Sequence, residues 1–269
     1  MLKDKGLQPG DRVGVMLPNV PYFGLVYYGV LRAGGVVVPM NVLLKSREVE
    51  FYLSDPAADQ LFGWHESGQA AEEGARAAGA DVIMVKPGEF EQLLATAPEA
   101  SEDAERQPSD TAVTLYTSGT TGTPKGAELT HANMTENCLH GGTPHVRVSE
   151  RDVILGALPL FHSFGQTCCM NNAVRAGACL TMIPRFDPGK ALEIQRDGVT
   201  LFEGVPTMYH AMLHHPALRR FEPADMRVRW LGDAGRGDAR LREGVRVCRA
   251  RGLRPVRDLT GGVVQPPRP

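Results

Sequence analysis

The segment from Thr117 to Gly126 combines the residue types that bind phosphate groups. Its sequence is Thr-Ser-Gly-Thr-Thr-Gly-Thr-Pro-Lys-Gly, so hydroxyls, glycines and a lysine follow one another closely. Glycines let backbone N–H groups turn toward an anion, hydroxyls donate hydrogen bonds, and an ammonium group neutralises charge. We therefore expect a polyphosphate site formed by Thr117, Ser118, Gly119, Thr120, Thr121, Gly122 and Lys125.

This segment differs from the common P-loop. In a P-loop, Gly-Lys is followed by Ser or Thr, whose hydroxyl binds magnesium. Here Pro124 precedes Lys125 and Gly126 follows it, and the segment has no Gly-x-Gly-x-x-Gly pattern. An unrelated NTPase of the P-loop type is thus disfavoured, although it stays as an alternative. A simple glycine-rich surface turn with an exposed lysine is the other alternative.

Short apolar runs, which predict buried strands, alternate with helical patterns along the chain. This succession is typical of an α/β fold with a mainly parallel sheet. The acidic residues 88–110 indicate a solvated linker. Strands are predicted at residues 12–17, 35–39, 80–85, 111–116, 152–158, 178–183 and 199–202, and helices over 20–34 and from about 46, 130 and 206.

Several segments together resemble one family. Tyr116 to Ala127 resembles the phosphate-binding signature of adenylate-forming enzymes, which include acyl-CoA synthetases, aryl-CoA ligases, luciferases and peptide-synthetase adenylation domains. Residues 6–19 and 29–41 resemble early segments of the same family. Leu158 to Gly165, with the sequence Leu-Pro-Leu-Phe-His-Ser-Phe-Gly, resembles its acyl-pocket motif, and residues 202–208 resemble the wall of that pocket. Within the family, the chain looks closest to fatty acyl-CoA synthetases.

The resemblance covers roughly residues 6–228 and implies the domain organisation. It predicts the parallel-sheet subdomains of the family's N-terminal domain, present here in incomplete form. The first α/β subdomain is expected at residues 1–159 and includes the phosphate loop at 116–127. A partial second subdomain with the acyl-pocket segments is expected at 160–228, followed by a disordered or non-native tail at 229–269.

The resemblance also implies a reaction and a set of binding residues. ATP binds with Mg²⁺, a small carboxylic acid (a fatty acid) attacks the α-phosphorus, and the acyl-adenylate passes its acyl group to the thiol of coenzyme A. His162 is expected at the junction of adenylate and acyl chain, with Gly204, Val205 and Thr207 along the acyl tunnel. A histidine after Pro-Leu-Phe without this context is more often a hydrogen-bonded core residue. No metal ligand is assigned, because the family's magnesium-binding glutamate is absent.

The last part of the chain departs from the family pattern. From Met226 onward its only basic residues are arginines, and its net charge is +7. Shifting the reading frame of codons that could encode Gly252 to Gly261 by one nucleotide yields Gly-Tyr-Gly-Leu-Ser-Glu-Thr-Ser-Pro, which resembles the family's missing adenine and magnesium segment. We therefore expect residues from about 229 onward to be an out-of-frame translation. A basic arm is the alternative.

Composition narrows the setting in which the protein works. The chain has 269 residues and a net charge of −2, which does not favour a nucleic-acid partner. Five cysteines without disulfide or zinc spacing, and no apolar membrane segment, favour the cytoplasm. We expect an acid–CoA ligase by descent that is impaired or inactive as this chain. A non-catalytic nucleotide- or acyl-binding remnant is the alternative. The sequence does not indicate an oligomeric state.

Overall fold

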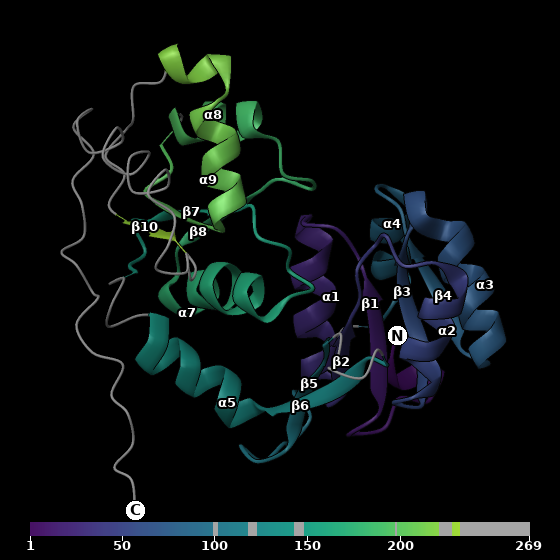
Figure 1. Ribbon diagram of the computed structural model, residues 1–269. Coiled ribbons are helices and arrows are strands. Elements are labelled where there is room, and N and C mark those ends of the chain that lie inside the picture. The colour runs from purple at the N-terminus through teal and green to yellow at the C-terminus, as the bar shows by residue number, and fades with distance from the viewer. Residues whose placement is uncertain (99–101, 118–122, 143–147, 197, 221–227, 232–269) are drawn as a thin grey trace, which may run out of the picture.

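The protein folds into two β-sheets whose faces are covered by helices (Figure 1). The computed structural model describes residues 1–98, 102–117, 123–142, 148–196, 198–220 and 228–231. The strands are β1 (Arg12–Met16), β2 (Val36–Pro39), β3 (Ala58–Trp64), β4 (Asp81–Val85), β5 (Thr111–Thr117), β6 (Lys125–Thr130), β7 (Val153–Gly156), β8 (Cys179–Met182), β9 (Leu201–Gly204) and β10 (Val228–Leu231).

The helices are mostly short and begin where the chain leaves a strand. None of those described is long and apolar enough to cross a membrane. The α-helices are α1 (Pro21–Arg32), α2 (Ser46–Ser54), α3 (Gly68–Ala78), α4 (Glu89–Thr96), α5 (His131–Glu136), α7 (Asn172–Ala176), α8 (Pro188–Arg196) and α9 (Pro206–Leu213). The 3₁₀ and π-helical segments are η1 (Lys3–Lys5), η2 (His65–Ser67), η3 (Asn137–Gly142), η4 (Gly165–Asn171) and η5 (Pro216–Arg220).

The first sheet has the strand order β4-β3-β1-β2-β5-β6. The first five of these strands are parallel, and β6 returns antiparallel to β5 at one edge. The central strands are rich in valine, and all four residues of β2 are buried. This is the pattern expected where helices cover both faces of a parallel sheet.

Helices cover both faces of this first sheet. On one face, α2 and α3 pack through Val49, Leu53, Ala71 and Ala75. On the other, Phe23 and further residues of α1 enter a core that also contains Phe90 of α4. The first sheet is therefore the middle layer of three, as the arrangement in Figure 1 shows.

The second sheet has the order β10-β9-β7-β8 and is wholly parallel. One face packs on α8 and α9. The other face shares a core with α1, which lies between the two sheets (Figure 1). A direct link across this boundary is the hydrogen bond from the Tyr28 hydroxyl of α1 to Asn171 Oδ1 of η4, at 2.6 Å. The predicted α/β class with parallel sheets is confirmed.

Some details differ from the sequence-based expectations. The linker predicted at 88–110 is partly wrong, because its first part forms α4 with a buried Phe90. The strand expected at 199–202 begins and ends two residues later, as β9. The change from the first sheet to the second lies between Thr130 and Val153, earlier than the predicted subdomain boundary after residue 159. Strand β10 includes residues 229–231, which we expected in the tail, and residues 232–269 lie outside the described part.

Candidate functional site

The predicted phosphate-binding segment is built on a β-hairpin. Thr117, the last residue of β5, pairs directly with Lys125, the first residue of β6. Both side chains are exposed. The predicted site residues Ser118, Gly119, Thr120, Thr121 and Gly122 lie outside the described residues. The structure thus brings together the two outer members of the predicted set at the carboxyl end of a parallel strand, where α/β proteins bind ligands.

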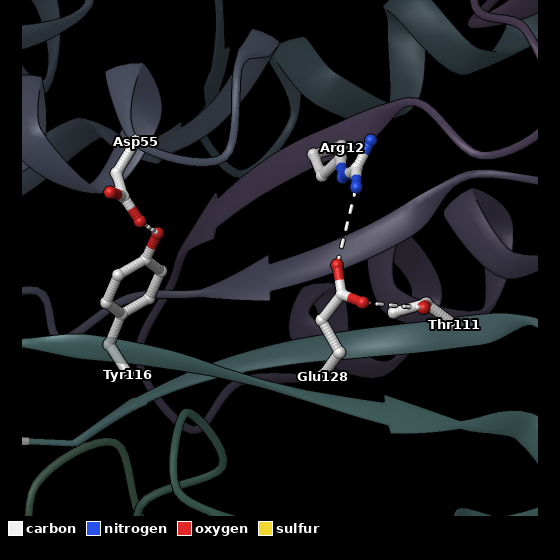
Figure 2. A network of polar contacts seen from close by, with 5 residues as sticks. All are labelled: Arg12, Asp55, Thr111, Tyr116 and Glu128. Atoms are coloured by element: carbon white, nitrogen blue, oxygen red, sulfur yellow. Dashed lines mark hydrogen bonds and ion pairs between the residues drawn. The ribbon is translucent and has the colours of Figure 1, made fainter.

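A tyrosine joins this end of the hairpin to α2. The Tyr116 hydroxyl donates a hydrogen bond to Asp55 Oδ2 at 2.5 Å (Figure 2). Its ring lies 4.5 Å from the Tyr52 ring, centroid to centroid. Burial is the first cause that raises the pKa of Tyr116, and the bond to Asp55 is the second. The phenol is therefore a stable hydrogen-bond donor at neutral pH.

An ion pair holds the other end of the same hairpin. Arg12 of β1 lies 3.3 Å from Glu128 of β6, nitrogen to oxygen, and the Thr111 hydroxyl of β5 donates to the second carboxylate oxygen at 3.3 Å (Figure 2). Both charged side chains are substantially exposed. The hairpin is therefore fastened by polar contacts at both ends.

A buried asparagine connects the carboxyl ends of the two central strands. Asn19 follows β1 and is 5% exposed. Its Nδ2 donates to the carbonyl oxygens of Gly156, which ends β7, and Leu158, at 3.0 and 2.7 Å. Its Oδ1 accepts from the Leu160 N–H at 2.9 Å. These three bonds hold the start of the predicted acyl-pocket motif beside the end of β1.

His162 lies in the tight turn that follows this connection. Its side chain is exposed, and its Nδ1 accepts a hydrogen bond from the Phe164 N–H at 3.3 Å. Its own N–H donates to the Pro159 carbonyl at 3.1 Å. The turn requires glycine at position 165, because a Cβ there would lie 2.2 Å from the Pro159 oxygen. The side chain of His162 is thus exposed, while its backbone is held in a tight turn.

The predicted acyl-tunnel residues follow the neighbouring strand, β9. Gly204 is buried at its end, Val205 is half-buried, and Thr207 is exposed in the first turn of α9. Helix α9 begins at Pro206, a favoured residue for a first helical position. A Cβ at Gly204 would lie 3.0 Å from the Phe202 ring, so glycine gives that ring its space.

The order of strands places these two segments at a topological switch point. Strand β7 lies between β8 and β9, so the chain leaves β7 toward one side and later returns on the other. Ligands of open α/β sheets bind outside the carboxyl ends of the strands at such a point. His162 follows β7, whereas Gly204 ends β9 and Val205 and Thr207 follow it. This topology supports a binding site formed by both predicted segments.

A buried carboxylate near this point escaped the sequence analysis. Glu203 of β9 is 2% exposed, and its Oε2 lies 4.0 Å from the Cys169 Sγ. Burial raises the pKa of Glu203 to about 7, and a hydrogen bond with Cys168 partly opposes this shift. Burial also raises the pKa values of both thiols. The sequence places Glu203 inside the predicted pocket segment Phe202–Met208, but it does not show that Glu203 is buried.

Asn19 was the second residue that the sequence analysis missed. The only local indication was its place in Leu-Pro-Asn after a predicted strand, and its partners lie about 140 residues further along the chain.

No cluster of three or more metal-binding side chains occurs within the described residues.

Comparison with known protein families identifies the family to which the chain belongs. The model of the family "AMP-binding enzyme" matches residues 1–261. The chain belongs to the AMP-binding enzyme family. The match continues past Val228 to residue 261, so the family likeness extends further along the chain than the predicted range of residues 6–228. The predicted relation to adenylate-forming CoA ligases is confirmed.

The names of curated relatives of this chain refer to different acids. The long-chain-fatty-acid–CoA ligase of Bacillus subtilis is 32% identical over 268 residues, covering 87% of this chain and 48% of that protein. A feruloyl-CoA synthase of Amycolatopsis is 34% identical, covering 87% and 46%. The chain thus spans about half the length of the curated relatives it matches.

Solved structures share the fold. ATP-bound MatB of Rhodopseudomonas palustris superimposes with a TM-score of 0.78 at 32% identity, covering 87% of this chain and 46% of that one. The inhibitor-bound N-terminal domain of FACL13 from Mycobacterium tuberculosis superimposes with a TM-score of 0.81 at 27% identity, covering 92% and 63%. The two sheets of this chain therefore correspond to part of the N-terminal domain of FACL13.

Proposed function

We propose that the chain is the ATP- and acid-binding part of an acid–CoA ligase. The phosphates of ATP bind at the β5–β6 hairpin, the carboxylate lies near His162, and the acyl group extends toward Gly204, Val205 and Thr207. The observation that carries this proposal is the direct pairing of Thr117 with Lys125, both exposed, at the carboxyl end of β5. This pairing lies within the segment that resembles the family's phosphate signature.

The chemistry of the complete enzyme explains why these groups are needed. A carboxylate attacks the α-phosphorus of ATP and pyrophosphate leaves; the thiol of coenzyme A then attacks the acyl carbon of the acyl-adenylate, forming the thioester and releasing AMP. Carboxylate and triphosphate repel each other, so the site must neutralise charge before and during attack. The Lys125 ammonium offsets charge on the leaving pyrophosphate, the Thr117 hydroxyl donates to it, and His162 orients the reacting acid. Mg²⁺ carried by ATP supplies further neutralisation when it is bound.

The proposed acid is a fatty acid. The resemblance of Leu158–Gly165 and Phe202–Met208 to the acyl segments of fatty acyl-CoA synthetases supports it, as does the similarity to the Bacillus subtilis ligase. The feruloyl-CoA synthase is equally similar to this chain. An aromatic acid therefore belongs in any substrate panel.

We further propose that the chain as written does not complete the reaction. Its tail lacks a recognisable adenine and magnesium segment. Loss of the contacts that such a segment makes with adenine and magnesium removes on the order of several kcal/mol of transition-state stabilisation. The out-of-frame origin of the tail stays a prediction. Sequencing the gene around codons 225–269 tests it, and an intact frame without an inserted or lost base would refute it.

The decisive experiment compares this chain with a version whose reading frame is restored. The restored protein should catalyse ATP–pyrophosphate exchange that depends on a fatty acid, with ferulic acid as the comparison. The 269-residue chain should bind ATP without exchange. Failure of the restored protein to exchange with any acid would favour a non-catalytic binding remnant. Phosphate release without an acid would favour an unrelated NTPase.

The proposed location is the cytoplasm. The described cysteines form no disulfide with one another, which suits a reducing compartment; they are Cys138, Cys168, Cys169 and Cys179.

A further inference from the structure

Tyr116 directly precedes Thr117, the first residue of the predicted phosphate-binding pair, and it contacts α2. Its hydroxyl is bonded to Asp55, which follows the last residue of α2. Its ring also meets the Phe51 ring edge-on, with centroids 6.0 Å apart, in addition to the closer Tyr52 ring. Two side chains near the carboxyl end of α2 and one directly after it therefore contact this tyrosine (Figure 2 shows the bond to Asp55).

The opposite strand is shaped to accept the Tyr116 ring. Tyr116 of β5 pairs with Gly126 of β6. A Cβ at Gly126 would lie 3.2 Å from Tyr116 Cζ and 3.0 Å from Thr114 Cγ2, closer than most side-chain contacts allow. The glycine in Pro-Lys-Gly thus leaves room for the ring across the hairpin. The sequence indicated Gly126 only as the end of the expected phosphate-binding segment.

Strand geometry separates Tyr116 from the phosphate-binding side chains. Successive residues of a strand point to opposite faces, and paired residues of neighbouring strands share a face. Tyr116 and Gly126 therefore lie on the face covered by α2, whereas Thr117 and Lys125 share the other face. Tyr116 cannot touch an anion held by that pair on the opposite face, and it can act on the pair only through the backbone.

We propose that Tyr116, fastened to Asp55, is a positioning residue that sets the placement of Thr117 and Lys125. The inference rests on the proposed function in that these two residues are taken to bind phosphate. Hydrogen bonding and ring packing hold β5 against α2 one residue before Thr117. The paired strand then carries the Lys125 ammonium to a defined place opposite it.

The ion pair at the far end of the hairpin provides a matched control. Arg12 and Glu128 also join the hairpin to a neighbouring element, but they act farther from Thr117 and Lys125, since Glu128 pairs with Thr114. If polar contacts merely stabilise the hairpin, loss of either contact should have the same consequences. If Tyr116 positions the pair, only its own contact should affect anion binding.

The test uses the 269-residue chain and three variants: Tyr116→Phe, Asp55→Ala and Arg12→Gln. Binding of Mg-pyrophosphate and MgATP is measured by calorimetry, amide hydrogen exchange is followed in β5 and β6, and the thermal midpoint is recorded. Tyr116→Phe and Asp55→Ala should each weaken anion affinity about fivefold and speed exchange around Thr117 and Lys125. The double variant should be no weaker than the single ones. Arg12→Gln should lower the midpoint similarly and leave affinity unchanged.

The outcomes separate this inference from the proposed function. Unchanged exchange around Thr117 in Tyr116→Phe, or an equal loss of affinity in Arg12→Gln, would overturn the positioning role. If Tyr116→Phe exchanges faster but the wild-type chain binds neither pyrophosphate nor ATP, the positioning role is supported and phosphate binding by the hairpin is contradicted. Faster exchange together with weaker anion binding supports both.

Discussion

The two halves of the proposed site are held in different ways. The hairpin that carries Lys125 is held by contacts near the surface, where Asp55 and Glu128 are exposed and Arg12 is partly exposed. The turn that carries His162 is fastened from inside, by the buried Asn19 and by the close backbone approach at Gly165. We infer that changes on the acid side mainly affect stability, whereas changes on the phosphate side mainly affect ligand affinity.

The largest effect is expected on the acid side, at Gly165. Gly165→Ala places a methyl group against the Pro159 carbonyl, which belongs to the backbone and cannot easily move. The free energy of unfolding should fall by about 3 kcal/mol or more in urea titrations. Gly29→Ala is the control, since its Cβ would meet nothing within 4 Å and helix α1 should gain about 0.5–1 kcal/mol. Equal effects of the two substitutions would contradict a closely packed turn.

Asn19→Ala is expected to have the next largest effect. It removes three hydrogen bonds and leaves buried carbonyl and N–H groups without partners, so unfolding should become easier by about 2–3 kcal/mol. Asn19→Asp keeps the size but loses the N–H donors, and it should be at least as destabilising at pH 7. Denaturant unfolding measures both. If Asn19→Asp were as stable as wild type, the connection between β1 and β7 would not depend on these bonds.

Glu203 should make the stability depend on pH. Its carboxyl has a pKa of about 7 when folded and 4.5 as the ordinary value, so the folded state holds more protons between these values. Its contribution to stability is therefore greatest at low pH and is lost as the pH rises. Unfolding at pH 5 should cost about 2 kcal/mol more than at pH 7 because of this group. Glu203→Gln should remove that part of the pH dependence, and an unchanged profile would show that Glu203 does not cause it.

The smallest effect is expected for the ion pair between Arg12 and Glu128 on the hairpin. Arg12 and Glu128 are exposed, and water screens their attraction. Arg12→Gln should therefore lower the free energy of unfolding by less than about 1 kcal/mol. A loss as large as that of Asn19→Ala, measured in the same denaturant series, would contradict the distinction between an exposed and a buried mode of fastening.

The sequence predicted the fold class and most elements that carry site residues, because valine-rich runs and the Gly/Thr segment are local patterns. It missed β3 and α3, where Gly63, Gly68 and Gly74 interrupt the apolar pattern. It also missed the antiparallel return of β6, since Lys125 to Thr130 has an exposed and polar beginning. Asn19 and Glu203 depend on partners distant in the chain, and a single sequence does not reveal burial.

The central claim is that the hairpin ending at Lys125 binds the phosphates of ATP. Its most direct test is calorimetric binding of MgATP and Mg-pyrophosphate to the wild-type chain, Lys125→Ala and Lys86→Ala. Lys86 follows β4, at the opposite edge of the same sheet, and serves as the control. The account predicts that Lys125→Ala binds both ligands about tenfold more weakly while Lys86→Ala binds them as wild type does. Equal affinities of the wild-type chain and Lys125→Ala would contradict it.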